Sequence, residues 1–438
     1  MDVRKHVLKP LHRWLHAFAP DTADWVRSQW NQVSHEISVW RVLRKDKEEP
    51  RRATLLIDVS KICMRDAGTG IQRVVRAVVR ELDAVGTPVL PCQVYHHALV
   101  TGHRFFQTIK GENAASGEES FVQIQSGDDL LLLDASFEFA RELGEAIDEV
   151  HVKGGKAYAV IYDLLPIQAP EDFSSSYDVR VFRNWITMIL SKADVVLCIS
   201  RTVADAVVRL YLRDEEVRRA RAGRALVVDA FPMGFDITEH DGGAREAMRR
   251  FVEGAGVTLL MVGTVEVRKQ HDVVLQALEQ MADLVRGGHV RLLILGHDGW
   301  KNERFKERLQ ADANGLFTDH VLWVQDASDE EVQWAYRHCS ALVAASHDEG
   351  FGLPLVEAAH FGLPIICSDI PIFHEVTEDY ATFFHEGDAA DLARTIRAWM
   401  DEDTHPDASL IPTHTWRESA EAILAILHGK VEPYRVVE

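Results

Sequence analysis

The sequence predicts an α/β protein built from two parallel-sheet domains that face each other across a cleft, with a helical arm in front. From residue 54 onward, short apolar runs alternate with segments whose apolar residues recur at helical spacing. Such alternation is typical of parallel strands covered by helices on both faces. A Gly- and Pro-rich segment, FPMGFDITEHDGGA at 231–244, interrupts the alternation and divides it in two. The length of 438 residues fits two or three domains.

Composition excludes several classes of protein. The net charge of −20 argues against a nucleic-acid partner, which requires a basic surface. The five cysteines are scattered without metal-ligand spacing, and most lie in apolar segments, as expected of reduced core residues in a cytosolic protein. No apolar run approaches the roughly 18 residues of a membrane span, and the first residues lack the apolar core of a signal peptide. We therefore expect a cytoplasmic protein.

Residues 1–52 form the expected arm. They carry 11 Lys and Arg against 7 acids, whereas the rest of the chain is strongly acidic. Four of the ten tryptophans fall here, and apolar residues recur at helical spacing near Trp14. A basic, Trp-containing amphipathic helix can lie on an anionic membrane surface, here the inner face of the membrane. The alternative is an arm that docks on its own protein or on a second subunit, and the sequence leaves both open.

The first domain is assigned to residues 53–235. Apolar runs predict its strands, and periodic segments predict helices over 71–82 and 178–191 and from about residue 202, the last capped by Ser200. The predicted strands are 54–60, 88–95, 129–134, 157–162 and 195–199.

The second domain is assigned to residues 236–414 and alternates strictly between strands and helices. Predicted helices cover 271–286, 302–313, 329–337 and 354–361, and the predicted strands are 257–262, 290–295, 321–324, 341–345 and 363–367. Residues 415–438 contain an apolar-periodic helix over 420–427 and a tail that reads as extended.

One stretch carries most of the functional information, SHDEGFGLPLVE at 346–357, between a predicted strand and a predicted helix. Gly350 and Gly352 allow bare backbone to approach a ligand, and the free N–H groups at a helix start favour an anion. Glu349 and Glu357 flank the loop, and a carboxylate can hold two vicinal hydroxyls. Phosphate-binding amides between two such acids indicate a nucleotide sugar. The alternative for Glu357 is a favourable charge in the first helical turn.

EGFGLPLVE resembles the E-x7-E motif of retaining glycosyltransferases of family 4, and the chain from about residue 54 to 427 is similar to that family's bacterial mannosyltransferases of polysaccharide biosynthesis. The resemblance implies the GT-B fold, two Rossmann-like domains across a cleft, with the last helix crossing back to the first domain. It implies that Glu349 contacts the donor sugar and Glu357 the ribose. It further implies that the backbone of Gly350, Phe351, Gly352 and Leu353 holds phosphate and sugar hydroxyls.

The turn GTVEVRKQH at 263–271 places Arg268 and Lys269 just before a helix. Two cations at the carboxyl edge of a sheet can neutralise a diphosphate, most of all when the nucleoside diphosphate leaves. The turn resembles the family's Gly-to-Lys turn, which implies that Lys269 is the diphosphate lysine and acts in catalysis. Thr264 stands where many members have an Arg, so Arg268 is the expected substitute. The alternative is a pair of solvated turn charges.

Asp163 ends the strand AYAVIYD, at the sheet edge where ligands bind. By resemblance it lies beside the acceptor and the donor sugar and serves as a general base or orienting group. The alternative is that it caps the following turn. The turn MRDAGTGIQ at 64–72 is not GxGxxG. The resemblance nevertheless places Gly68 and Gly70 near the donor diphosphate, and Arg73 can reach the same place.

The nucleobase is expected at two loops that end adjacent strands, LGHDGW at 295–300 and WVQDAS at 323–328. In the family these loops hold the base, which implies contacts with His297, Trp323, Val324 and Gln325. The alternative for Trp323 is packing in the core.

These observations predict a retaining hexosyltransferase that moves a sugar from a nucleotide diphospho-sugar to a glycan or lipid-linked acceptor. GDP-mannose is favoured by similarity, with dTDP-rhamnose and UDP-sugars open. No metal or other cofactor is expected, because the DED run at 401–403 matches DxD only in composition. Two other hypotheses remain: a catalytically silent sugar-nucleotide-binding scaffold and a sugar-nucleotide epimerase. Product analysis separates all three.

Overall fold

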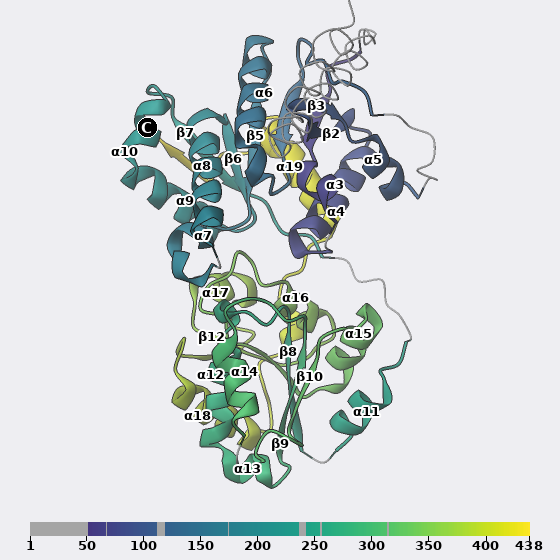
Figure 1. Ribbon diagram of the computed structural model, residues 1–438, viewed down its shortest axis with the longest axis vertical. Coiled ribbons are helices and arrows are strands. Elements are labelled where there is room, and N and C mark those ends of the chain that lie inside the picture. The colour runs from purple at the N-terminus through teal and green to yellow at the C-terminus, as the bar shows by residue number, and fades with distance from the viewer. Residues whose placement is uncertain are drawn as a thin grey trace, which may run out of the picture.

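The computed structural model describes residues 51–66, 68–111, 119–173, 175–235, 242–254, 256–312 and 315–438. The basic arm predicted over residues 1–52 lies outside the described residues except for its last two. The described chain forms two α/β units, one above the other along the long axis of Figure 1. No helix within these ranges combines the length and the apolar character that crossing a membrane requires.

The first unit is built on an eight-stranded sheet with the order β14-β7-β6-β5-β4-β1-β2-β3. The sheet is parallel except at its edges, where β3 and β14 pair antiparallel with their neighbours. In the centre, Leu56 lies in register between Leu90 and Leu130, so apolar side chains form continuous rows. The strands are β1 (Leu55–Asp58), β2 (Val89–Tyr95), β3 (Ala98–Thr101), β4 (Asp129–Leu132), β5 (Ala157–Ile161), β6 (Val195–Cys198), β7 (Leu226–Ala230) and β14 (Arg435–Val437).

Helices cover both faces of this sheet. The helix α4 (Gly70–Ala84) opens with a capping box between Thr69 and Gln72, and its valine-rich face is buried. As predicted, the Ser200 hydroxyl accepts a hydrogen bond from the Val203 N–H and caps the helix that follows β6, α9 (Arg201–Arg213). The remaining helices are α3 (Ser60–Met64), α5 (His103–Ile109), α6 (Ala140–Val152), α7 (Leu165–Gln168), α8 (Ser176–Lys192) and α10 (Glu215–Ala220), with the short 3-10 helices η2 (Phe137–Phe139) and η3 (Pro170–Asp172).

The second unit is built on a six-stranded sheet, order β10-β9-β8-β11-β12-β13, in which every pair is parallel. Each of its first five strands lies within two residues of the prediction. The sixth strand, β13, was not predicted. The strands are β8 (Val257–Val262), β9 (Val290–Leu295), β10 (Val321–Val324), β11 (Ala341–Ala344), β12 (Ile365–Ser368) and β13 (Thr382–Phe384). Buried clusters fill both faces of this sheet.

The single helix predicted over 271–286 is wrong in one respect, because it breaks at the fully buried Met281. The two pieces are α12 (His271–Gln280) and α13 (Ala282–Arg286). The helical periodicity of the apolar residues runs through the break, so the pattern does not reveal it. The other helices are α11 (Glu246–Val252), α14 (Glu303–Gln310), α15 (Asp329–His338), α16 (Leu353–His360), α17 (Pro371–Thr377) and α18 (Ala389–Asp401), with η4 (Val267–Lys269) and η5 (Ala408–Leu410).

Two chain segments cross between the units side by side. On the outgoing segment, the Phe235 N–H donates to the carbonyl of His414 on the returning segment at 2.7 Å. The returning chain forms α19 (Trp416–Leu427), which packs into the core of the first unit. A Cβ on Gly234 would lie 2.5 Å from the Trp416 ring, so this crossing requires glycine. The tail predicted as extended is a strand, β14, and it covers the otherwise open edge of β7.

Candidate active site

The glycine loop joins β11 to α16 and faces the first unit. Gly352 is the N-cap of α16 with φ 101°, and a Cβ there would lie 3.1 Å from both Leu355 and Phe373. Within the described residues, the N–H groups of Gly350, Phe351 and Gly352 have no hydrogen-bond acceptor. Free amides at the start of a helix favour an anion. The loop therefore has the local geometry predicted for binding phosphate.

Glu349 lies at the centre of the site and contacts both predicted cations. Its Oε1 is 2.8 Å from the Lys269 Nζ, and its Oε2 is 2.5 Å from a terminal nitrogen of Arg268. The Ser346 hydroxyl donates a further hydrogen bond to Oε1 at 3.0 Å. All three charged side chains are between 12% and 17% exposed, so solvent screens these contacts only partly.

This arrangement controls the charge on Glu349. Burial alone would raise the pKa of its carboxyl, but the charges and hydrogen bonds of Arg268 and Lys269 outweigh burial and hold the pKa at about 2. Arg268 is itself fixed by Glu266, a carboxylate that is only 4% exposed, and it donates to the Asp348 carbonyl at 3.0 Å. The cations are thus held in place before any ligand arrives.

Glu357 has a partner from each unit. The Tyr336 hydroxyl of α15 donates to its Oε2 at 2.8 Å, and Arg73 of α4 reaches across to its Oε1 at 2.9 Å. The sequence placed Arg73 near the diphosphate, whereas the structure pairs it with the residue predicted to hold the ribose. A ribose diol at Glu357 would therefore compete with the Arg73 guanidinium for the same oxygen.

Asp163 follows β5 and faces the same cluster. Its Oδ1 accepts the Leu165 N–H at 3.1 Å, which is the turn-capping contact that the sequence left open. Burial raises the pKa of this carboxyl to about 6, and the charge of Arg268 opposes the rise. A carboxyl with this pKa can exchange a proton near neutral pH, as a general base requires.

The first unit packs directly against the glycine loop of the second unit. A Cβ on Gly350 would lie 2.3 Å from the Tyr162 carbonyl oxygen, and the Ser200 hydroxyl donates to the Gly350 carbonyl at 3.0 Å. Gly70 lies close by, because a Cβ there would be 3.4 Å from the Leu353 side chain. Gly68 has φ 65° and forms the preceding turn. The glycine turn of the first unit therefore meets the glycine loop of the second.

Little empty space remains beneath the loop. A cavity lined by Lys269, Ser346, Glu349 and Gly352, among others, has a volume of about 20 Å³. That volume holds about one water molecule. This cavity is therefore too small to hold a nucleotide sugar.

The predicted nucleobase residues do not all present side chains to a ligand. His297 and Gln325 are exposed at the ends of β9 and β10. Trp323 packs edge-to-face on Phe305, and its indole N–H donates to the Gly296 carbonyl at 2.8 Å. The Val324 side chain lies in the hydrophobic core, because alternate residues of a strand point to opposite faces of the sheet, which leaves its backbone to face a base.

Sequence reasoning missed several residues that shape the site. Glu266 and Tyr336 orient Arg268 and Glu357, and Asp172 of the first unit accepts from His347 of the glycine loop at 2.6 Å. Only Glu266, two positions before Arg268 in the same turn, had a recognisable signal. Among the described residues, no group of three or more His, Cys, Asp or Glu is arranged to hold a metal ion.

Solved structures with a similar fold identify the architecture of this chain. The crystal structure of Anabaena HepE in complex with UDP-glucose matches this chain with a TM-score of 0.54, at 15% identity, over 85% of this chain and 94% of that one. The sucrose-phosphate synthase of Thermosynechococcus elongatus matches with a TM-score of 0.52, at 18% identity, over 86% and 98% of the two chains. At these identities the likeness is one of fold, and it confirms the GT-B architecture predicted for the chain.

A family model identifies the second unit more specifically. Residues 249–413 match the model described as Glycosyl transferases group 1. This range contains Lys269, Glu349 and Glu357. The chain therefore contains a glycosyl transferases group 1 domain, which confirms the resemblance drawn from its motifs.

Relatives extend the likeness to the first unit. The serotype-specific mannosyltransferase WbdA of Escherichia coli is 31% identical over 396 residues, which is 88% of this chain and 47% of that protein. The O-antigen chain mannosyltransferase B of Escherichia coli is 26% identical over 163 residues, 37% of this chain and 39% of that protein. The chain thus spans about half the length of the WbdA proteins that it resembles.

Proposed function

We propose that this chain is a retaining, metal-independent glycosyltransferase that moves a mannosyl group from GDP-mannose to a glycan or lipid-linked acceptor. The observation that carries the proposal is the cluster of Lys269, Arg268 and Glu349 beside the free amides of the glycine loop. Two fixed cations and a helix start offer a diphosphate its preferred partners, while the carboxylates offer partners to sugar and ribose hydroxyls.

Each group has a defined part in the proposed reaction. The units separate, admit the donor and close, which expels water from the site. The diphosphate replaces Glu349 as the ion-pair partner of Lys269 and Arg268. The Glu349 carboxylate then accepts hydrogen bonds from hydroxyls of the donor sugar. As the sugar–phosphate bond breaks, the same two cations stabilise the growing charge on the leaving group. Asp163 orients the acceptor hydroxyl or receives its proton.

Retention is proposed to follow from attack on the face that the diphosphate leaves. Ion pairs occupy both oxygens of Glu349 in the structure, so this carboxylate is a poor candidate for a covalent nucleophile. The leaving phosphate itself is near enough to the incoming hydroxyl in such a mechanism to take its proton.

Mannose is favoured because the relatives that match most of this chain are named mannosyltransferases. Two relatives that match shorter parts of the chain are named O-antigen chain mannosyltransferases, which supports a growing polysaccharide as acceptor. We further propose a cytoplasmic location, with the arm of residues 1–52 lying on the inner membrane surface or docking on a second subunit. If deletion of residues 1–47 leaves binding to anionic vesicles unchanged, the membrane version is contradicted.

The donor proposal is tested by thermal stabilisation with GDP, UDP, dTDP and ADP, each at saturating concentration. A ligand that binds only the native state adds about 2.7 kcal/mol to stability at a hundred times its Kd. We expect GDP to stabilise the chain and Glu357→Ala to lose that effect. Glu307→Ala, at an exposed position of the same unit, is the control and should behave as the wild type. Stabilisation by another nucleotide would contradict GDP-mannose, and stabilisation by none would contradict the donor site.

A further inference from the structure

A second cavity lies where the two units meet, on the other side of the turn that carries Lys269. Its volume is about 570 Å³, within the range of small-molecule sites. Residues of both units line it, namely Glu171 and Asp172 from the segment after α7 and residues of the 265–272 turn and the start of α14 from the second unit. A ligand here would touch both units when they are closed.

Five carboxylates and two cations, Lys301 and Arg304, line this cavity, and the fold orients several of the carboxylates. Asp172 is held by His347 and Glu266 by Arg268, so neither can turn away. Asp272 and Glu303 lie in the first turns of α12 and α14, a helix position that favours acids. The Glu303 side chain has no hydrogen-bond or ion-pair partner among the described residues. Because five acids outnumber two cations, the wall disfavours phosphates and other anions, whereas its carboxylates accept hydrogen bonds from neutral hydroxyls.

A buried histidine gives independent evidence for a ligand. His271 lines this cavity and also the small one beneath the glycine loop, and it is 3% exposed. Its Nδ1 has no hydrogen-bond partner in the described part of the chain, and its ring packs edge-on against Phe305. A buried polar atom without a partner costs free energy, so a hydroxyl or a ligand-bound water that reaches it would stabilise the site.

We infer that this cavity is an acceptor subsite that binds a neutral, hydroxyl-rich oligosaccharide, the part of the glycan behind its growing end. The inference rests on the proposed function and deepens it. The cavity shares Glu266 with the donor cluster through Arg268, and it shares Asp172 with the glycine loop through His347. A chain lying in it therefore ends beside the donor cluster, next to the predicted nucleobase loop 295–300, which continues into Asn302 and Glu303 of the cavity wall.

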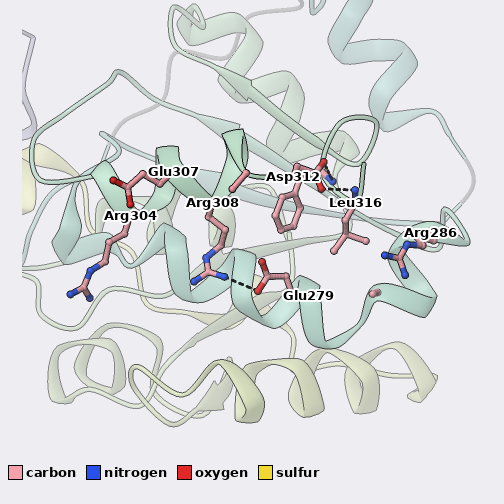
Figure 2. A pocket seen from close by; sticks show the side chains of 10 residues that line it. Glu279, Arg286, Arg304, Glu307, Arg308, Asp312 and Leu316 are labelled. Carbon is pink, nitrogen blue, oxygen red and sulfur yellow. Dashed lines mark hydrogen bonds and ion pairs between the residues drawn. The ribbon is translucent and has the colours of Figure 1, made fainter. Parts of the chain in front are cut away.

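The test uses the whole chain and α-mannotetraose as the probe, with binding measured by titration calorimetry. Glu303→Gln removes one charged acceptor from the cavity wall. Glu307→Gln is the matched control on the same helix, one turn on, where Figure 2 shows Glu307 on a separate cavity with Glu279 and Arg308. We expect saturable binding to the wild type and to Glu307→Gln, and a Kd about fivefold or more higher for Glu303→Gln. Asp272→Asn provides a second variant with the same expected direction.

GDP-induced thermal stabilisation of every variant is measured in parallel and should equal that of the wild type. If GDP fails to stabilise any of them while mannotetraose binds as expected, the proposed donor function fails and the subsite stands. If the wild type does not bind mannotetraose saturably, or if Glu303→Gln, Asp272→Asn and Glu307→Gln all bind it alike, the subsite is refuted.

Discussion

Replacing Glu349 with Gln keeps the shape of the side chain and removes the charge that Lys269 and Arg268 both contact. In the folded protein the pKa of this carboxyl lies at about 2, against an ordinary value of 4.5. A difference of this size means that folding favours the ionised form by roughly 3 kcal/mol. The variant leaves two cations close together, with Glu266 as the remaining acidic partner of Arg268. We expect a loss of stability of about 3 kcal/mol, or roughly 6–12 °C in the unfolding midpoint for a domain of this size.

The nucleotide should reverse part of this loss. In the wild type, the Glu349 carboxylate competes with a diphosphate for the two cations, and the variant lacks this competing charge. GDP is therefore expected to stabilise Glu349→Gln more than the wild type, although sugar transfer should fall by on the order of 10²–10³. Differential scanning fluorimetry with and without GDP, together with a transfer assay, measures both effects.

Glu279→Gln is the control, because Glu279 pairs with Arg308 at a contact in which the two side chains are 41% and 31% exposed. Its effect should stay within about 1 kcal/mol. The wild-type advantage over Glu349→Gln should be complete above about pH 4.5 and should vanish as the pH falls toward 2, because the folded pKa is depressed. A midpoint for Glu349→Gln equal to that of Glu279→Gln would contradict the stabilising role of Glu349, and weaker stabilisation by GDP than in the wild type would contradict its competition with the diphosphate.

Three further outcomes follow from the structure. Burial raises the pKa of the fully buried Asp58 from 3.8 to about 7, so wild-type stability should fall as the pH rises between these values. Asp58→Asn should flatten this dependence of stability on pH, as measured by urea titrations. An unchanged dependence in the variant would contradict the raised pKa of Asp58. Gly350→Ala sets a Cβ against the Tyr162 carbonyl oxygen, so it should abolish transfer while GDP still stabilises the chain, and normal turnover would show that closure is not needed. Arg73→Ala breaks a half-exposed ion pair with Glu357, so stability should change by less than about 1 kcal/mol. Calorimetry should show that GDP binds this variant a few fold more tightly, and weaker binding would mean that Arg73 holds the nucleotide.

The second unit was more predictable from the sequence than the first. Its strands are short apolar runs with charged or Gly-rich borders, and the glycine loop and the Lys269 turn both stand at strand ends. In the first unit, β7 was missed, and the tail was therefore predicted only as extended, without the pairing with β7 that makes it β14. A strand that pairs with the end of the chain depends on contacts far apart in sequence, and no local pattern encodes them. The break at Met281 was not predicted for a different reason, because the helical periodicity of the apolar residues continues through it.

The site divides in the same way. Lys269, Arg268, Glu349 and the glycine loop lie in two local motifs, and the structure brings these motifs into contact. The partners of Glu357 come instead from α15 and from the other unit, and their identity depends on how the units close. Trp323 could have pointed to a ligand or to the core, and only the packing of its ring on Phe305 decides between them.

The most direct test of the account is the product formed from GDP-mannose labelled with ¹³C in the sugar, incubated with the chain and α-mannotetraose and followed by NMR. A retaining mannosyltransferase forms a pentasaccharide whose new linkage keeps the α configuration of the donor, and we expect Lys269→Ala to form this product on the order of 10²–10³ more slowly. A β linkage would contradict retention. Labelled donor that is isomerised without transfer would indicate an epimerase, and donor that is bound but left unchanged would indicate a scaffold.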